Sequence, residues 1–129
     1  MKSDEAFMRE LQPHVERTVK KICSALEELA SKQSGETTAH ITELLNSEAL
    51  SVKSAIEAKG RMTGRESQEK TLRRVRILRS TSITDQIMKR CGLDSGQKGH
   101  LHKRIREEVE GFYNALFILW ETDRQEERS

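Results

Sequence analysis

The chain has 129 residues, enough for one domain that buries roughly two-thirds of the surface its unfolded form would expose. A net charge of only +2, together with clear helical periodicity, argues against a disordered chain. The longest apolar run, Ala115 to Trp120, is far shorter than the ~20 residues that span a bilayer, which excludes a membrane-spanning helix.

The first predicted helix covers about residues 4–32. Apolar residues recur in it at three- and four-residue steps, from Met8 through Val15 and Ile22 to Leu29, so they share one face. Pro13 lies inside this pattern. Because proline lacks the amide donor and clashes with the preceding turn, we expect a kink or a restart of the helix there.

The second predicted helix covers about residues 37–59 and carries Ile41, Leu45 and Val52 on its apolar face. The sequence Gly60-Arg61-Met62-Thr63-Gly64 follows. Two glycines in five residues predict a break, and we expect a hinge there because the sign of the charge changes across this loop.

The third predicted helix, about residues 66–91, is the least regular. Ser80-Thr81-Ser82 is a poor helix interior because short hydroxyl side chains compete for backbone hydrogen bonds. We therefore expect a break near residues 80–82, with a short helix carrying Ile83 and Ile87 after it. Gly92, Gly96 and Gly99 then predict a loop.

The fourth predicted helix covers about residues 100–122, and four of the five aromatic residues of the chain lie in it. Aromatic side chains bury the most area per residue, so this stretch should form the core or an oligomer interface. The residues expected in that role are Phe112, Tyr113, Leu116, Phe117 and Trp120.

These elements predict an all-α fold: a single domain over residues 1–129, built as a four-helix (possibly five-helix) bundle with short polar loops. Leu, Ile, Val and Phe number only 28, so the core should be thin. A homo-oligomer is a natural way to cover the surface that such a core leaves exposed.

The charges are sorted into three blocks. Residues 1–58 contain 7 Lys and Arg against 10 Asp and Glu, and residues 107–129 contain 2 against 7. The middle block, residues 59–106, contains 14 against 4, a net charge of +10. Such a segment either attracts a polyanion or lies against the acidic helices of its own chain or of a dimer partner. The residues able to compensate it are Glu16, Glu27, Glu28, Glu43 and Glu48.

The cations of the middle block form two clusters, one in the third helix and one at the start of the fourth. If they meet in space, they make a face for a phosphate backbone. The predicted anion-binding residues are Lys70, Arg73, Arg74, Arg76, Arg79, Lys98, His100, Lys103, Arg104 and Arg106. Aromatic residues are not interleaved with them, so base stacking is not indicated.

From these patterns we predict a non-catalytic protein that binds DNA or RNA electrostatically. The alternative is a helical protein–protein interaction module, or an assembly subunit, whose basic face docks an acidic partner or its own acidic helices. A helix-turn-helix unit over Thr84 to Ile105 fits poorly because Gly96 and Gly99 would lie in its recognition helix.

Catalytic signatures are absent from the sequence: it has no phosphate-binding loop, no nucleophile elbow and no Cys/His pair at catalytic spacing. Glu107 and Glu110 have the spacing of helical metal-binding carboxylates, but no matching pair is evident. We expect no enzyme activity, no metal and no cofactor.

The predicted location is intracellular, in the cytoplasm or with the nucleoid or nucleus. The start of the chain, Met1 to Glu5, lacks the apolar stretch of a signal peptide. Cys23 and Cys91 have no metal-ligand spacing and lie within reach of apolar stripes, which predicts two reduced, largely buried thiols.

Overall fold

The computed structural model describes the backbone of residues 3–29, 35–63, 65–92 and 99–128, and the side chains of residues 3–28, 35–55, 57, 70, 73–74, 76–92 and 99–120. Within these ranges it is entirely helical except at a few terminal residues: α1 is Asp4–Leu29, α2 is Gly35–Thr63, α3 is Arg65–Arg90 and α4 is Gly99–Arg128. The all-α prediction is confirmed, and the chain has four described helices rather than five.

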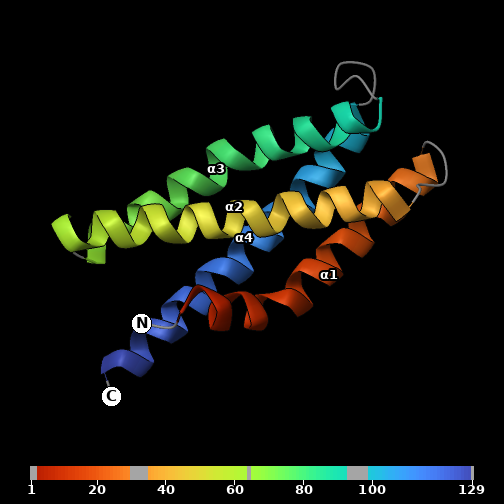
Figure 1. Cartoon of the computed structure of the whole chain (residues 1–129). Coiled ribbons are helices and arrows are strands. Elements are labelled where there is room, and N and C mark those ends of the chain that lie inside the picture. The colour runs from red at the N-terminus through yellow and green to blue at the C-terminus, as the bar shows by residue number, and fades with distance from the viewer. Residues whose placement is uncertain (1–2, 30–34, 64, 93–98, 129) are drawn as a thin grey trace.

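The four helices pack in a closed cycle, in which α1 contacts α2 and α4 while α3 contacts α2 and α4. Figure 1 shows that the α2–α3 pair crosses the α1–α4 pair, so the two pairs spread apart toward the turn between α2 and α3. All four helices contribute to one core. Its largest fully buried side chains include Phe7 and Leu11 of α1, Ile41 of α2, Ile87 of α3 and Phe112 of α4.

Local signals explain where two of the helices begin or end. The Ser3 hydroxyl accepts a hydrogen bond from the Ala6 amide at 3.2 Å, which satisfies one of the amides that a helix N-terminus leaves without a partner. At the end of α3, Gly92 has a φ of +73° and its amide donates to the Lys89 carbonyl at 3.1 Å. A residue with a side chain would be strained in this left-handed conformation, so glycine suits the cap.

The predicted break near residues 80–82 was wrong, because α3 is continuous from Arg65 to Arg90. Ser80 and Thr84 are fully buried, so the packing of this turn outweighs its weak intrinsic helix propensity. The Thr84 hydroxyl also donates to the Ser80 carbonyl at 2.7 Å, which satisfies it inside the helix rather than at a break.

Two other boundaries differ from the predictions. The predicted loop at residues 60–64 is mostly helix, because α2 continues to Thr63 and α3 begins at Arg65; Gly64 lies outside the described residues. At Pro13 we expected a kink or a restart: α1 is continuous from Asp4 to Leu29, so it does not restart, and its first turns lie at an angle to the rest, as a kink predicts (Figure 1). Cys23 and Cys91 are free thiols, and both are half-buried rather than largely buried.

Candidate functional site

The predicted anion-binding residues divide into two groups according to what they contact. α3 and α4 are packed neighbours, but Arg76 lies beside Asn114 whereas His102 lies beside Asp85, so the two basic clusters occupy different levels of the bundle. From residue 76 to residue 85 a helix rises about 13 Å. The two clusters are therefore offset along the bundle by about that distance. Lys98 lies outside the described residues.

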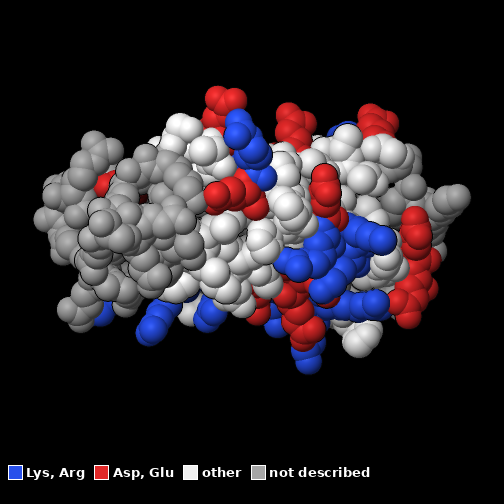
Figure 2. Space-filling model, turned by 90° about the horizontal axis from the view of Figure 1, so that it is seen from below, with Lys and Arg blue, Asp and Glu red and all other residues white. Residues whose placement is uncertain are grey.

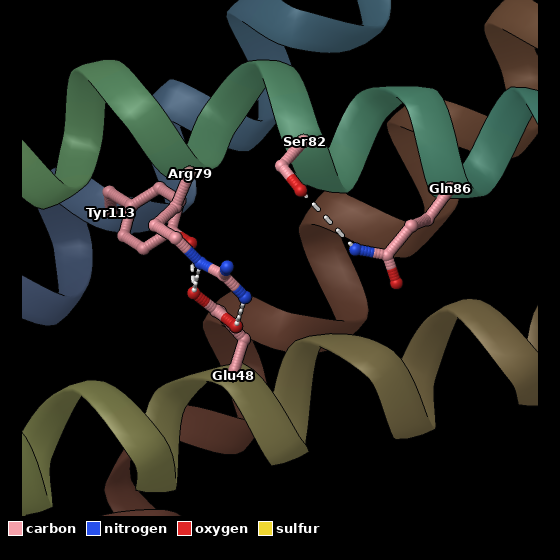
Figure 3. A network of polar contacts seen from close by, with 5 residues as sticks. All are labelled: Glu48, Arg79, Ser82, Gln86 and Tyr113. Carbon is pink, nitrogen blue, oxygen red and sulfur yellow. Dashed lines mark hydrogen bonds and ion pairs between the residues drawn. The ribbon is translucent and has the colours of Figure 1, made fainter.

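Arg79 belongs to the first cluster, but its charge is used inside the bundle. Its Nε and Nη2 atoms donate to Oε1 and Oε2 of Glu48 at 2.8 and 2.9 Å, and the Tyr113 hydroxyl donates to Glu48 Oε1 at 2.7 Å. Figure 3 shows these three side chains converging from α2, α3 and α4. The Glu48 side chain is only 7% exposed, whereas that of Arg79 is 46% exposed.

The pKa values of this network reflect its geometry. Burial raises the pKa of Glu48, but the hydrogen bonds from Arg79 and Tyr113 outweigh burial, so its pKa lies below the ordinary value. The same contact with Glu48 raises the pKa of Arg79, and burial raises that of Tyr113. The network is therefore an ion pair that joins three helices, and Glu48 compensates the charge of Arg79.

The cluster in α4 is partly paired. Arg104 Nη1 lies 2.5 Å from Glu28 Oε2, and His102 Nε2 lies 2.8 Å from Asp85 Oδ1. Arg106 Nε lies 3.8 Å from Glu110 Oε1, one helical turn away. His100 and Lys103 are exposed on the same helix. Acidic residues of α1 and α4 thus pair with Arg104 and Arg106, whereas His100 and Lys103 form no ion pair among the described residues.

Sequence reasoning overlooked a further group of cations on α1. Arg17, Lys20 and Lys21 line a surface hollow together with Arg104 and Glu108. In Figure 2, which views the molecule from below Figure 1, Lys and Arg side chains gather on one part of the surface with Asp and Glu around them. Lys21 Nζ lies 3.9 Å from Glu108 Oε2. This face mixes both signs of charge, which weakens its attraction for a polyanion.

The remaining cations, in the first half of α3, have a different environment. Lys70, Arg73, Arg74 and Arg76 are exposed. Arg76 donates to the neutral side chain of Asn114 at 3.0 Å, and within the described part of the chain no carboxylate forms an ion pair with Arg73 or Arg74. One turn further along, Ile77 and Leu78 are 64% and 63% exposed. We call the exposed set Lys70, Arg73, Arg74, Ile77 and Leu78 the α3 surface; these residues line one shallow hollow.

The residues predicted for the core or an oligomer interface lie mostly in the interior of the single chain. Phe112, Tyr113, Leu116 and Trp120 are buried, and Phe117 is half-buried against the core. On the same helix, Ile118 is 63% exposed.

Two further observations concern other classes of function. Among the described residues, no group of three or more His, Cys, Asp or Glu side chains is placed to hold a metal ion. None of the described helices has the length and apolarity needed to cross a membrane.

Comparison with protein-family models, curated proteins and solved structures gives no match for this chain.

Proposed function

We propose that the protein is a non-catalytic helical interaction module whose α3 surface docks an acidic, amphipathic segment of another protein. The observation that carries this proposal is the exposure of Ile77 and Leu78 directly beside Arg73 and Arg74, which make no ion pair within the described residues. Isolated apolar residues are common on protein surfaces, but an adjacent exposed apolar pair beside arginines fits the composition of protein interfaces, in which arginine is enriched.

The spacing of these residues suits a helical partner. Arg73 and Ile77, like Arg74 and Leu78, are four residues apart and so form two neighbouring ridges on α3. A helix with leucines on one face and glutamates along its edges would cover the two apolar residues and bring its carboxylates to the arginines. Arginine is well suited to this role because its planar fork binds a carboxylate with two hydrogen bonds.

Fluorescence anisotropy with a synthetic acidic helix of Glu, Ala and Leu tests the proposal at about 0.15 M salt. The control peptide has the same composition with its leucines distributed around the helix. The peptide with its leucines on one face should bind more tightly than the control peptide. Both Arg73→Gln/Arg74→Gln and Ile77→Ser/Leu78→Ser should weaken its binding by about tenfold. Lys89→Gln/Lys103→Gln, which removes the same charge elsewhere, should have little effect. Equal binding of the two peptides would contradict the proposal.

Binding of DNA or RNA backbone is the second candidate function, and it also rests on α3. Arg73, Arg74 and Arg76 lie within one helical turn with no carboxylate in contact among the described residues, which leaves their charge available to phosphates. Titration with labelled duplexes at several salt concentrations distinguishes the two functions. Nucleic-acid affinity should fall steeply with salt and be insensitive to Ile77→Ser/Leu78→Ser, whereas docking of the acidic helix requires Ile77 and Leu78.

A second copy of this chain is the other occupant to test, since we expect a homo-oligomer. Sedimentation over a range of protein concentrations addresses this directly. Loss of a dimer on Ile77→Ser/Leu78→Ser would assign the α3 surface to self-association. A dimer that persists unchanged would leave the surface open to the acidic partner. The intracellular location expected from the sequence is compatible with either occupant.

A further inference from the structure

A small pocket between α3 and α4 borders the α3 surface. It has a volume of about 140 Å³ and is lined by Arg73, Arg76, Tyr113, Asn114 and Phe117. Tyr113 is buried and Phe117 half-buried, whereas the two arginines and Asn114 are exposed. The aromatic residues therefore form the inner part of the pocket and the polar residues form its mouth. Arg73 belongs both to this pocket and to the α3 surface.

The hydrogen bonds around the pocket decide what each lining residue offers to a ligand. The Tyr113 hydroxyl is already bound to Glu48, so Tyr113 offers its ring rather than a polar group. Arg76 Nη1 donates to Asn114 Oδ1 at 3.0 Å, which positions its guanidinium at the mouth. A guanidinium has five donors, so this single bond leaves others available to an anion. Within the described residues, Arg73 has no ion-pair partner.

The size and lining of the pocket define the group it accepts. Its volume is close to the ~150 Å³ of a protein cavity that binds benzene. An aromatic ring of that size would contact the rings of Tyr113 and Phe117 and lie near two guanidinium groups, each favourable for a ring. A carboxylate next to that ring would reach the two arginines at the mouth.

We infer that this α3–α4 pocket receives a phenylalanine-sized aromatic side chain of the docked acidic segment, and that a neighbouring carboxylate of the segment pairs with Arg73 and Arg76. The inference rests on the proposed function and adds to it the residue that anchors the partner. Arg73 and Ile77 are one turn apart, so a single helix can place its aromatic residue in the pocket and an apolar residue on Ile77.

The first test uses 3-phenylpropionate as the probe and the ¹H–¹⁵N NMR spectrum of the full chain as the readout. We expect saturable shifts at the side-chain resonances of Asn114, Arg73 and Arg76, with a dissociation constant on the order of millimolar. The amide 3-phenylpropionamide keeps the ring without the charge, and propionate keeps the charge without the ring. Each should bind at least about tenfold more weakly.

A matched pair of variants locates the binding. Arg73→Gln should weaken 3-phenylpropionate by about tenfold, whereas Lys103→Gln removes an exposed charge elsewhere and should leave binding unchanged. Both residues are exposed, so both variants should fold. Equal affinity for 3-phenylpropionate and propionate would overturn the inference, because the arginines would then only attract anions. Absence of saturable shifts at the lining residues would also overturn it.

The second test uses two acidic helical peptides that differ by Phe or Ala at one central position. The Phe peptide should bind about tenfold more tightly, and Arg73→Gln should reduce this difference. Equal affinity of the two peptides, with binding still dependent on Ile77 and Leu78, would overturn the inference while the proposed function stands. If neither peptide binds and 3-phenylpropionate does, the proposed function fails, and the assignment of the pocket to a docked segment fails with it.

Discussion

Arg104 and Arg74 belong to the same basic segment of the sequence, but among the described residues only Arg104 contacts a carboxylate. From Arg79 onward several arginines of this segment meet acids: Arg79 meets Glu48 of α2, Arg104 meets Glu28 of α1, and Arg90 Nη2 lies 3.8 Å from Glu36 Oε1. Before Arg79, the described residues contain no carboxylate paired with Arg73, Arg74 or Arg76. Cation density along a sequence is therefore a poor measure of the charge available to a ligand.

The burial of the apolar residues of α3 changes at the same point of the helix, close to Arg79. Ile83, Ile87 and Met88 are buried in the core, whereas Ile77 and Leu78 are largely exposed. The second half of α3 lies where the four helices converge, and the first half lies where the two pairs have spread apart (Figure 1). Ile77 and Leu78 are exposed there beside Arg73 and Arg74, which leaves this apolar surface accessible to a partner.

The largest difference in the free energy of unfolding should appear when a buried and an exposed isoleucine of α3 are each replaced by alanine. Ile87→Ala should lower the free energy of unfolding by about 2–5 kcal/mol, because the side chain is fully buried and its removal leaves a cavity. Ile77→Ala should change it by less than about 0.5 kcal/mol, because the side chain is exposed. Urea unfolding of both variants measures this. A large loss for Ile77→Ala would mean that the first half of α3 is packed in solution.

Loss of the ion pair between Glu48 and Arg79 should have the next largest effect on the free energy of unfolding. Glu48→Ala should cost about 2–3 kcal/mol, because it removes the acceptor of Arg79 and leaves the buried Tyr113 hydroxyl without one. Glu28→Ala is the control: it removes the exposed partner of Arg104 and should cost less than about 1 kcal/mol. Similar losses in the two variants, again measured by urea unfolding, would show that burial does not distinguish these pairs.

Charge reversal in the two clusters compares their availability to a partner. Arg73→Glu/Arg74→Glu should weaken binding of the acidic helix by at least about tenfold, or about 1.4 kcal/mol. Lys103→Glu/Arg104→Glu makes the same change in net charge and should weaken binding by less than about threefold. Anisotropy titrations at two salt concentrations measure both. Equal losses would indicate that only the total charge of the protein matters.

The smallest predicted effect is a pH dependence of the stability of the folded chain, which comes from Glu48. Its pKa is lower in the folded chain than its ordinary value of 4.5, so the folded state favours the ionised carboxylate. The stability that this contributes is present above pH 4.5 and lost as the pH falls through the folded-state pKa. The difference in urea midpoint between wild type and Glu48→Gln should stay constant from neutral pH down to about pH 5, then shrink. A difference that does not shrink as the pH falls below 4.5 would contradict this origin.

Helical periodicity in the sequence is enough to predict the helices and most of their inward faces. The apolar period along α1 from Leu11 to Leu26 and the aromatic stretch of α4 were sufficient, because a helix buries the face on which apolar residues recur. Periodicity does not predict the continuity of α3 at Ser80. Local propensity disfavours a helix there, and only the burial of Ser80 and Thr84 in the bundle reverses that preference.

The pairing of the cations depends on how the helices pack and cannot be read from the sequence. Glu48 and Arg79 are 31 residues apart, and Glu28 and Arg104 are 76 apart, so no local pattern connects them. The α3–α4 pocket is likewise invisible in the sequence, since Arg73 and Phe117 meet only through the antiparallel packing of two helices. Helical periodicity is a property of neighbouring residues, whereas charge pairing and pockets depend on which helices lie side by side and at what register.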